Sequence, residues 1–113
     1  MLRVVFPTNQ KMSYISPIAS SFEKSNYLTV LDLMGQNIAD VHIIKNPHPH
    51  SDEEIIKECV DKHFGVLILP DCKNVPVKKL KKNGTTVFDS GNNKIIIDIV
   101  SQFIQDKLVK IKS

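Results

Sequence analysis

The sequence contains few cysteines, one arginine and no long apolar run, and each shortage excludes a class of protein. Two cysteines in 113 residues are too few for a disulfide framework, and Cys59 and Cys72 are too far apart for a zinc ribbon or a redox pair. The longest uncharged apolar runs, residues 65–70 and 95–97, are far shorter than the roughly 20 residues that span a bilayer. The first residues lack a signal-peptide core and a cleavage site. We therefore expect a cytoplasmic protein without a membrane segment.

The shortage of arginine argues against a nucleic-acid partner. The net charge is +3, but residues 1–57 carry five basic and six acidic side chains, whereas residues 58–113 carry ten and six. Of the fifteen basic residues only Arg3 has the guanidinium group that binds phosphates and bases in a bidentate manner. Lysines 78, 79, 81 and 82 surround a short helical stripe without an aromatic residue on which a base could stack. We expect a solvated helix face there.

Short apolar runs alternate with helical patterns along a chain whose length suits a single domain of residues 1–113. A hydrophobic content of 42 % is ordinary for a globular protein. The order of these patterns predicts an α/β domain with a mixed five-stranded sheet, in which the second strand runs antiparallel to the other four. Strands are expected at residues 2–6, 27–33, 38–45, 66–69 and 85–88, helices from Ser51, Pro76 and Ile95 onward, and a long polar loop at residues 10–26.

The helix that begins after Ser51 has the clearest local signals. Glu54 follows Ser51 by three residues, which is the spacing of a capping box. Cys59 lies on the apolar face of this helix, so we interpret it as a buried structural thiol. His63 comes at the end of the helix, where a protonated imidazole favours the helix dipole.

Polar residues follow the strands that run in the same direction. Such strands end at one edge of the sheet, and ligands of open α/β sheets bind at that edge. One binding site is therefore predicted there, next to the loop of residues 10–26. The residues that follow these strands are Thr8, Asn9, Asn46, His48, His50, Asp71, Cys72, Asp89 and Ser90.

Cys72, His48 and His50 are the candidate metal ligands. Lys73, next to Cys72, could stabilise the thiolate that binds metals, although an inert and partly buried loop cysteine is the alternative. His48 and His50 flank Pro49, and imidazole together with thiolate suits iron or zinc. The His-Pro-His triplet has no specific ligand spacing, so a solvated loop before the helix is the alternative.

No catalytic residues are predicted. The sequence has no glycine-rich phosphate loop and no nucleophile beside an evident base. Asp71 and Asp89 are expected at neighbouring strand ends, but the first strand offers no third carboxylate to complete a metal site. An enzyme that uses Asp71 and Asp89 with a divalent ion remains as a third hypothesis.

Three segments of the sequence resemble one known family. Residues 6–9 read Phe-Pro-Thr-Asn, residues 16–27 read Ser-Pro-Ile-Ala-Ser-Ser-Phe-Glu-Lys-Ser-Asn-Tyr, and residues 46–48 read Asn-Pro-His. These segments resemble the dinitrogenase iron-molybdenum cofactor biosynthesis family, also called nitrogenase accessory factor-like proteins. The resemblance implies a three-layer α/β/α domain with a ribonuclease H-like sheet, strand order 3-2-1-4-5 and an antiparallel second strand. It also implies a non-catalytic carrier of iron-sulfur or iron-molybdenum precursors.

The chain departs from the family pattern in the loops. Family members commonly have His-Phe-Gly-Arg in the long loop, where this chain has Ser21, Phe22, Glu23 and Lys24. Residues 70–74 replace a glycine-rich turn after the fourth strand.

The resulting hypothesis is an accessory protein that holds a metal cluster at the strand-end edge and passes it to a protein partner. Cys72 would be the thiolate ligand and His48 or His50 the imidazole ligand, with a cofactor-binding set of Thr8, Asn9, Ser21, Lys24 and Lys73. Lys24 and Lys73 would neutralise an anionic cluster. The alternative is a protein-interaction or regulatory module that kept the fold and lost the metal. In either case the third strand is expected at an edge of the sheet, where a second copy could pair with it.

Overall fold

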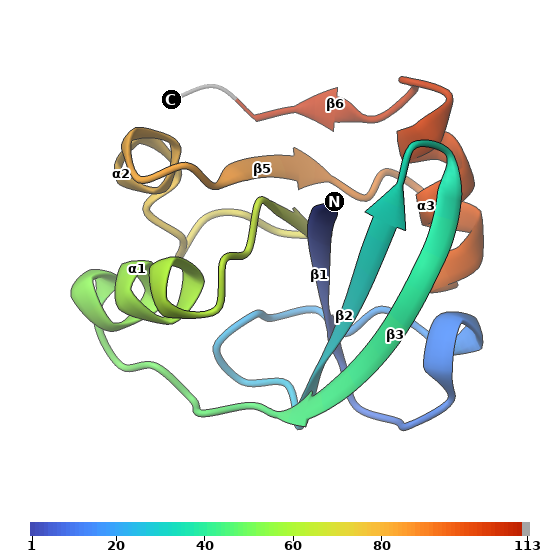
Figure 1. Ribbon diagram of the computed structural model, residues 1–113. Coiled ribbons are helices and arrows are strands. Elements are labelled where there is room, and N and C mark those ends of the chain that lie inside the picture. The colour runs from blue at the N-terminus through green and yellow to red at the C-terminus, as the bar shows by residue number, and fades with distance from the viewer. Residues whose placement is uncertain (112–113) are drawn as a thin grey trace.

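A mixed sheet forms the centre of the computed structural model, which describes residues 1–111 (Figure 1). The strand order is β3-β2-β1-β4-β5-β6. Strands β1, β4 and β5 are parallel, β2 is antiparallel to both β1 and β3, and β6 is antiparallel to β5. The prediction of an α/β fold is confirmed, but the expected five-stranded sheet is wrong, because a sixth strand follows β5. The strands are β1 Leu2–Thr8, β2 Tyr27–Met34, β3 Asn37–Lys45, β4 Val66–Leu69, β5 Thr86–Asp89 and β6 Val109–Lys110.

The sixth strand was missed because the apolar spacing of the last helix continues beyond the end of that helix. Helix α3, Ile96–Ile104, ends before Asp106, which has a left-handed backbone with φ of +61°. The backbone N–H of Lys107 donates to the carbonyl oxygen of Gln102 at 2.9 Å and closes the turn. Leu108 therefore packs on the core from a loop, and the next two residues pair with β5.

The helices form layers on both faces of the sheet. Helix α1, Asp52–Asp61, and helix α2, Val77–Lys82, cover one face, whereas α3 covers the other (Figure 1). Because successive strand residues point to opposite faces, Val5 belongs to the core beneath α1 and α2 and Val4 to the core beneath α3. No helix within residues 1–111 has the length and apolar character needed to cross a membrane.

Helix α1 begins with the expected capping box. The Ser51 hydroxyl accepts from the backbone N–H of Glu54 at 3.2 Å, and a carboxylate oxygen of Glu54 accepts from the backbone N–H of His50 at 2.7 Å. The helix ends at Asp61, two residues before His63, which the sequence places at the end of the helix. His63 follows with φ of +58°, so this residue forms the turn that leads into β4.

The long polar loop is folded onto the end of β1. It contains a short 3-10 helix, η1 at Ser13–Ile15, and single bridges join Thr8 to Ile18 and Pro17 to Ile95. The backbone N–H of Ala19 also donates to the carbonyl oxygen of Pro7 at 2.7 Å. These contacts bring the loop to the strand ends, where the sequence predicts a site.

Candidate functional site

A cavity of about 500 Å³ lies where β3 ends, and we call it the loop-end cavity. Two segments far apart in the sequence build it: the end of the long loop and the connection from β3 to α1. Two of the predicted ligands, His48 and His50, and one predicted cation, Lys24, therefore share a cavity. Its lining residues are Glu23, Lys24, His48, Pro49 and His50.

The buried side chain of Asn46 holds these two segments together. Its amide nitrogen donates to the carbonyl oxygen of Phe22 at 2.7 Å and to the hydroxyl of Ser25 at 3.0 Å. Its amide oxygen accepts from the backbone N–H of His48 at 2.9 Å. The Asn46 amide, whose residue is only 2 % exposed, thus helps to set the position of His48 relative to the long loop.

His48 is held in an unusual conformation with one ring nitrogen free. Its φ of +53° lies in the left-handed region, which residues other than glycine rarely adopt and which often marks a functional position. The ring Nδ1 lies 3.0 Å from the carbonyl oxygen of Glu23. A carbonyl oxygen only accepts hydrogen bonds, so Nδ1 carries a proton, and in the neutral imidazole Nε2 is then the nitrogen with the free lone pair. Histidines that bind metals are commonly oriented in this way.

A second cavity of about 390 Å³ also has His48 in its wall, and we call it the lysine cavity. Lys11 and Lys45 line it, and the Lys11 ammonium lies 5.0 Å from the centre of the Tyr27 ring. The two cavities together have three lysines and one carboxylate, Glu23, in their walls, a balance of +2 with neutral histidines. The surroundings of His48 therefore favour an anionic ligand.

Cys72 lies elsewhere, and the predicted set of Cys72, His48 and His50 is not assembled. Three strand intervals separate β3 from β4, so the residues that follow these strands start about 14 Å apart. Within residues 1–111, the one group of three histidine, cysteine or acidic side chains close enough to share an ion is Asp32, Asp40 and His42. The order of the elements places these polar residues at one edge of the sheet, but it does not show how far apart they lie along that edge.

The environment of Cys72 also disfavours a thiolate. Burial raises the pKa of the Cys72 thiol to about 11, and the carboxylates of Asp89 and Asp71 add to the rise. The expectation that Lys73 stabilises a thiolate is therefore wrong. Lys73 is exposed, and its backbone N–H donates to the Asp71 carboxylate at 3.0 Å.

The remaining predicted residues have structural contacts. Thr8 is fully buried inside β1, and its hydroxyl lies 3.0 Å from that of Thr29. The Asn9 side chain accepts from the backbone N–H of Asn26 at 3.0 Å, at the edge of the lysine cavity. The Ser21 hydroxyl accepts from the backbone N–H of Lys24 at 3.2 Å and holds the turn that carries this lysine.

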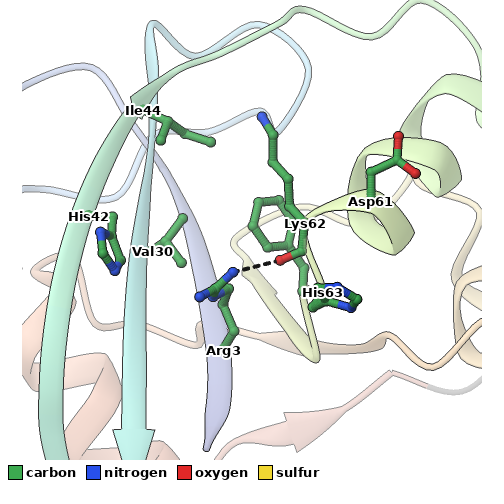
Figure 2. A pocket seen from close by; sticks show the side chains of 8 residues that line it. Arg3, Val30, His42, Ile44, Asp61, Lys62 and His63 are labelled. Carbon is green, nitrogen blue, oxygen red and sulfur yellow. Dashed lines mark hydrogen bonds between the residues drawn. The ribbon is translucent and has the colours of Figure 1, made fainter.

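A third cavity, of about 380 Å³, was not anticipated, and we call it the sheet-face cavity (Figure 2). It lies between the strands β1 to β3 and the end of α1. His42 and Arg3 extend from the strands, whereas Asp61, Lys62 and His63 come from the helix end (Figure 2). Val30, Ile44 and Phe64 complete the wall.

Arg3 connects this cavity to a buried carboxylate. Its Nε donates to Asp32 at 2.9 Å and its Nη1 to the carbonyl oxygen of Lys62 at 2.9 Å. The hydrogen bond from Arg3 holds the pKa of the Asp32 carboxyl below its ordinary value although burial opposes this, and His42 contributes in the same direction. Polar residues within the strand patterns were the only sequence signal of this cluster, because the register shift between Asp32 and Leu33, which brings Asp32 opposite Asp40, is not visible in the sequence.

Comparison with known proteins shows the fold. No known family model matches the sequence, and no curated protein matches it. Among solved structures, a candidate NifB protein from Thermotoga aligns with a TM-score of 0.76 at 19 % identity, over 100 % of this chain and 96 % of that one. A candidate dinitrogenase from Methanocaldococcus jannaschii aligns at 0.68 and 18 % identity, over 99 % and 96 %.

The apo form of the orange protein from Desulfovibrio gigas aligns with a TM-score of 0.77 at 15 % identity, over 100 % of this chain and 95 % of that one. In each case the similarity covers nearly the whole of both chains. Over residues 1–111 the chain therefore has the same fold as these three proteins.

Proposed function

We propose that this chain is a small, non-catalytic accessory protein that carries an anionic metal cluster, of the iron-sulfur or iron-molybdenum kind, and delivers it to a protein partner. The observation that carries the proposal is His48, whose Nδ1 is occupied by the Glu23 carbonyl while Nε2 is available beside two cavities rimmed by lysines. The fold shared with a candidate NifB protein and a candidate dinitrogenase supports the same class of cargo. So does the resemblance of the loop segments to the cofactor biosynthesis family.

The donor groups around His48 fit such a cargo. Imidazole is a ligand for iron, and His48 and His50 supply two imidazoles to the loop-end cavity. The ammonium groups of Lys24, Lys11 and Lys45 would balance the negative charge of the cluster. Cys72 is not part of this proposed site, because it lies at a different strand end, where burial and nearby carboxylates raise the pKa of its thiol.

The role of the protein is then to hold and protect the cargo. Asn46 positions His48, and the Ser21 hydroxyl positions the backbone of Lys24, so both sides of the cavity are set by hydrogen bonds within the chain. Binding through one or two imidazoles and surface lysines is weaker than binding through several thiolates. A carrier needs such a balance, because it must release what it holds.

A protein-interaction module that has lost metal binding is the second candidate, and a particular surface favours it. Met12, Tyr14 and Ile15 in and beside η1 are 45 %, 46 % and 51 % exposed, which is high for large apolar side chains so close together. This candidate predicts no metal uptake and a partner whose capture is abolished by Tyr14→Ser with Ile15→Ser.

Anaerobic reconstitution with ferrous iron and sulfide tests the carrier proposal. We expect the wild type to gain visible absorption and His48→Asn to lose most of it, since asparagine tolerates a left-handed backbone but supplies no imidazole. His63→Asn is the matched control, because His63 has a similar φ but lies outside the loop-end and lysine cavities. The same absorption in His48→Asn as in the wild type, or none in the wild type, would refute the proposed site.

A further inference from the structure

Three side chains that could share a metal ion lie together on one face of the sheet, away from the loop-end cavity. Asp32 on β2 is directly opposite Asp40 on β3, and His42 lies two residues further along β3 on the same face. The His42 Nε2 atom lies 3.2 Å from a carboxylate oxygen of Asp32 and 3.1 Å from one of Asp40. All three ligand atoms lie within 4.8 Å of one another.

These distances suit a shared divalent ion. Zinc binds nitrogen and oxygen ligands at about 2.0–2.2 Å, so neighbouring ligands of a tetrahedral site are roughly 3.3–3.6 Å apart. The two distances from Nε2 fall short of that by only a few tenths of an ångström. In the neutral imidazole whose proton lies on Nδ1, Nε2 has a free lone pair that it can offer to the ion.

Arg3 orients the Asp32 carboxylate, and the net charge of the cluster with Arg3 included is negative. It engages one oxygen, Oδ1, and leaves Oδ2 directed at His42. With Arg3 positive, two carboxylates negative and a neutral imidazole, the cluster has a charge of −1, which a divalent cation changes to +1. The Lys62 ammonium, the nearest other cation in the cavity wall, is paired with Glu58 and does not compete for these carboxylates.

The cavity beside the cluster leaves room for further ligands. His42 and Arg3 are both in the wall of the sheet-face cavity (Figure 2), so one side of the cluster opens onto about 380 Å³ of space. Three protein ligands with an open position are typical of ions that bind exchangeable water or a small ligand.

We propose that Asp32, Asp40 and His42 form a binding site for a divalent transition-metal ion such as Zn²⁺, independent of the cluster site at His48. The three ligands come from neighbouring positions of two paired strands, so strand pairing sets the spacing of their backbones. One imidazole and two carboxylates suit Zn²⁺ and similar ions better than Ca²⁺ or Mg²⁺, which prefer oxygen ligands alone.

Calorimetric titration of Zn²⁺ into the metal-free full chain tests this site. To remove competing imidazoles, all variants are made in a His48→Asn, His50→Asn background. We expect one Zn²⁺ per chain in this background, and at least a tenfold loss of affinity in both His42→Gln and Asp40→Asn. These two side chains are 46 % and 60 % exposed, so both variants should fold. Asp61→Asn is the matched control, because Asp61 lines the same cavity but is not a ligand; its affinity should change less than twofold.

Mn²⁺ gives a second readout that locates the ion. Its paramagnetism should broaden the backbone amide signals of Asp32, Asp40 and His42 first in the background protein, and should leave them sharp in His42→Gln. Absence of Zn²⁺ binding up to millimolar concentration, or equal binding in His42→Gln, would overturn the proposal. Neither outcome bears on cluster uptake at His48, which the reconstitution experiment measures separately.

Discussion

Replacing Asn46 by alanine should both destabilise the fold and release His48. The side chain makes three hydrogen bonds, to Phe22, Ser25 and His48, and is 2 % exposed. A net contribution of about 1 kcal/mol for each bond gives a loss of about 3 kcal/mol in the free energy of unfolding. For a domain of this size that corresponds to a fall of roughly 10 °C in melting temperature.

Urea unfolding of wild type and Asn46→Ala measures this loss, with Asn26→Ala as the control. Asn26 lies at the other side of the same junction but is exposed, so its truncation should change the stability by less than about 0.5 kcal/mol. Because Asn46 also orients His48, cluster uptake by Asn46→Ala should fall even under conditions where the variant is fully folded. A loss of stability below about 0.5 kcal/mol in Asn46→Ala would refute this account of the junction.

Three further predictions concern the ion pair, the helix cap and the thiols. In the folded protein the pKa of Asp32 lies below its ordinary value of about 4. Its ion pair with Arg3 therefore stabilises the protein fully above about pH 4, and this stabilisation is lost as the pH falls toward the pKa of Asp32 in the folded protein. Arg3→Met should therefore lower the free energy of unfolding by about 1–2 kcal/mol at pH 7, a value reduced for the partial exposure of Arg3. The difference in stability between variant and wild type should become smaller below pH 4; a difference that does not change with pH would contradict this prediction. Ser51→Ala should cost about 1 kcal/mol in thermal unfolding through loss of the helix cap, whereas exposed Ser20→Ala should cost nothing measurable. With pKa values of about 11 for Cys72 and about 12 for Cys59, the reaction of Cys72 with an aromatic disulfide should still accelerate with rising pH above pH 9; a rate that levels off near pH 8 would show a stabilised thiolate.

The sequence predicted helices and strands well where a local pattern fits only one kind of secondary structure. The apolar run of Val66–Leu69 became the buried strand β4, and the capping box of Ser51 and Glu54 began α1. Strand β6 was missed because two residues carry no strand pattern of their own and pair only after α3 has turned back. The end of β1 was placed too early, since Pro7 reads as a turn but pairs with Leu28 inside the sheet.

The grouping of polar residues around the loop-end cavity was predicted as far as chain order determines it. The sequence brought His48, His50 and Lys24 to one edge, and the structure assembles these three around one cavity. Cys72 was assigned to the same centre because chain order does not show lateral distance along an edge. The cluster of Asp32, Asp40 and His42 depends on strand register and on Arg3, and neither can be derived from spacing along the chain.

Metal analysis of the chain purified without oxygen measures whether His48 holds a metal cluster. We expect several iron atoms per chain, with or without molybdenum, in the wild type and in His63→Asn, and a loss of most of that metal in His48→Asn. Iron bound equally by the wild type and by His48→Asn, or no iron in any of the three proteins, would contradict it.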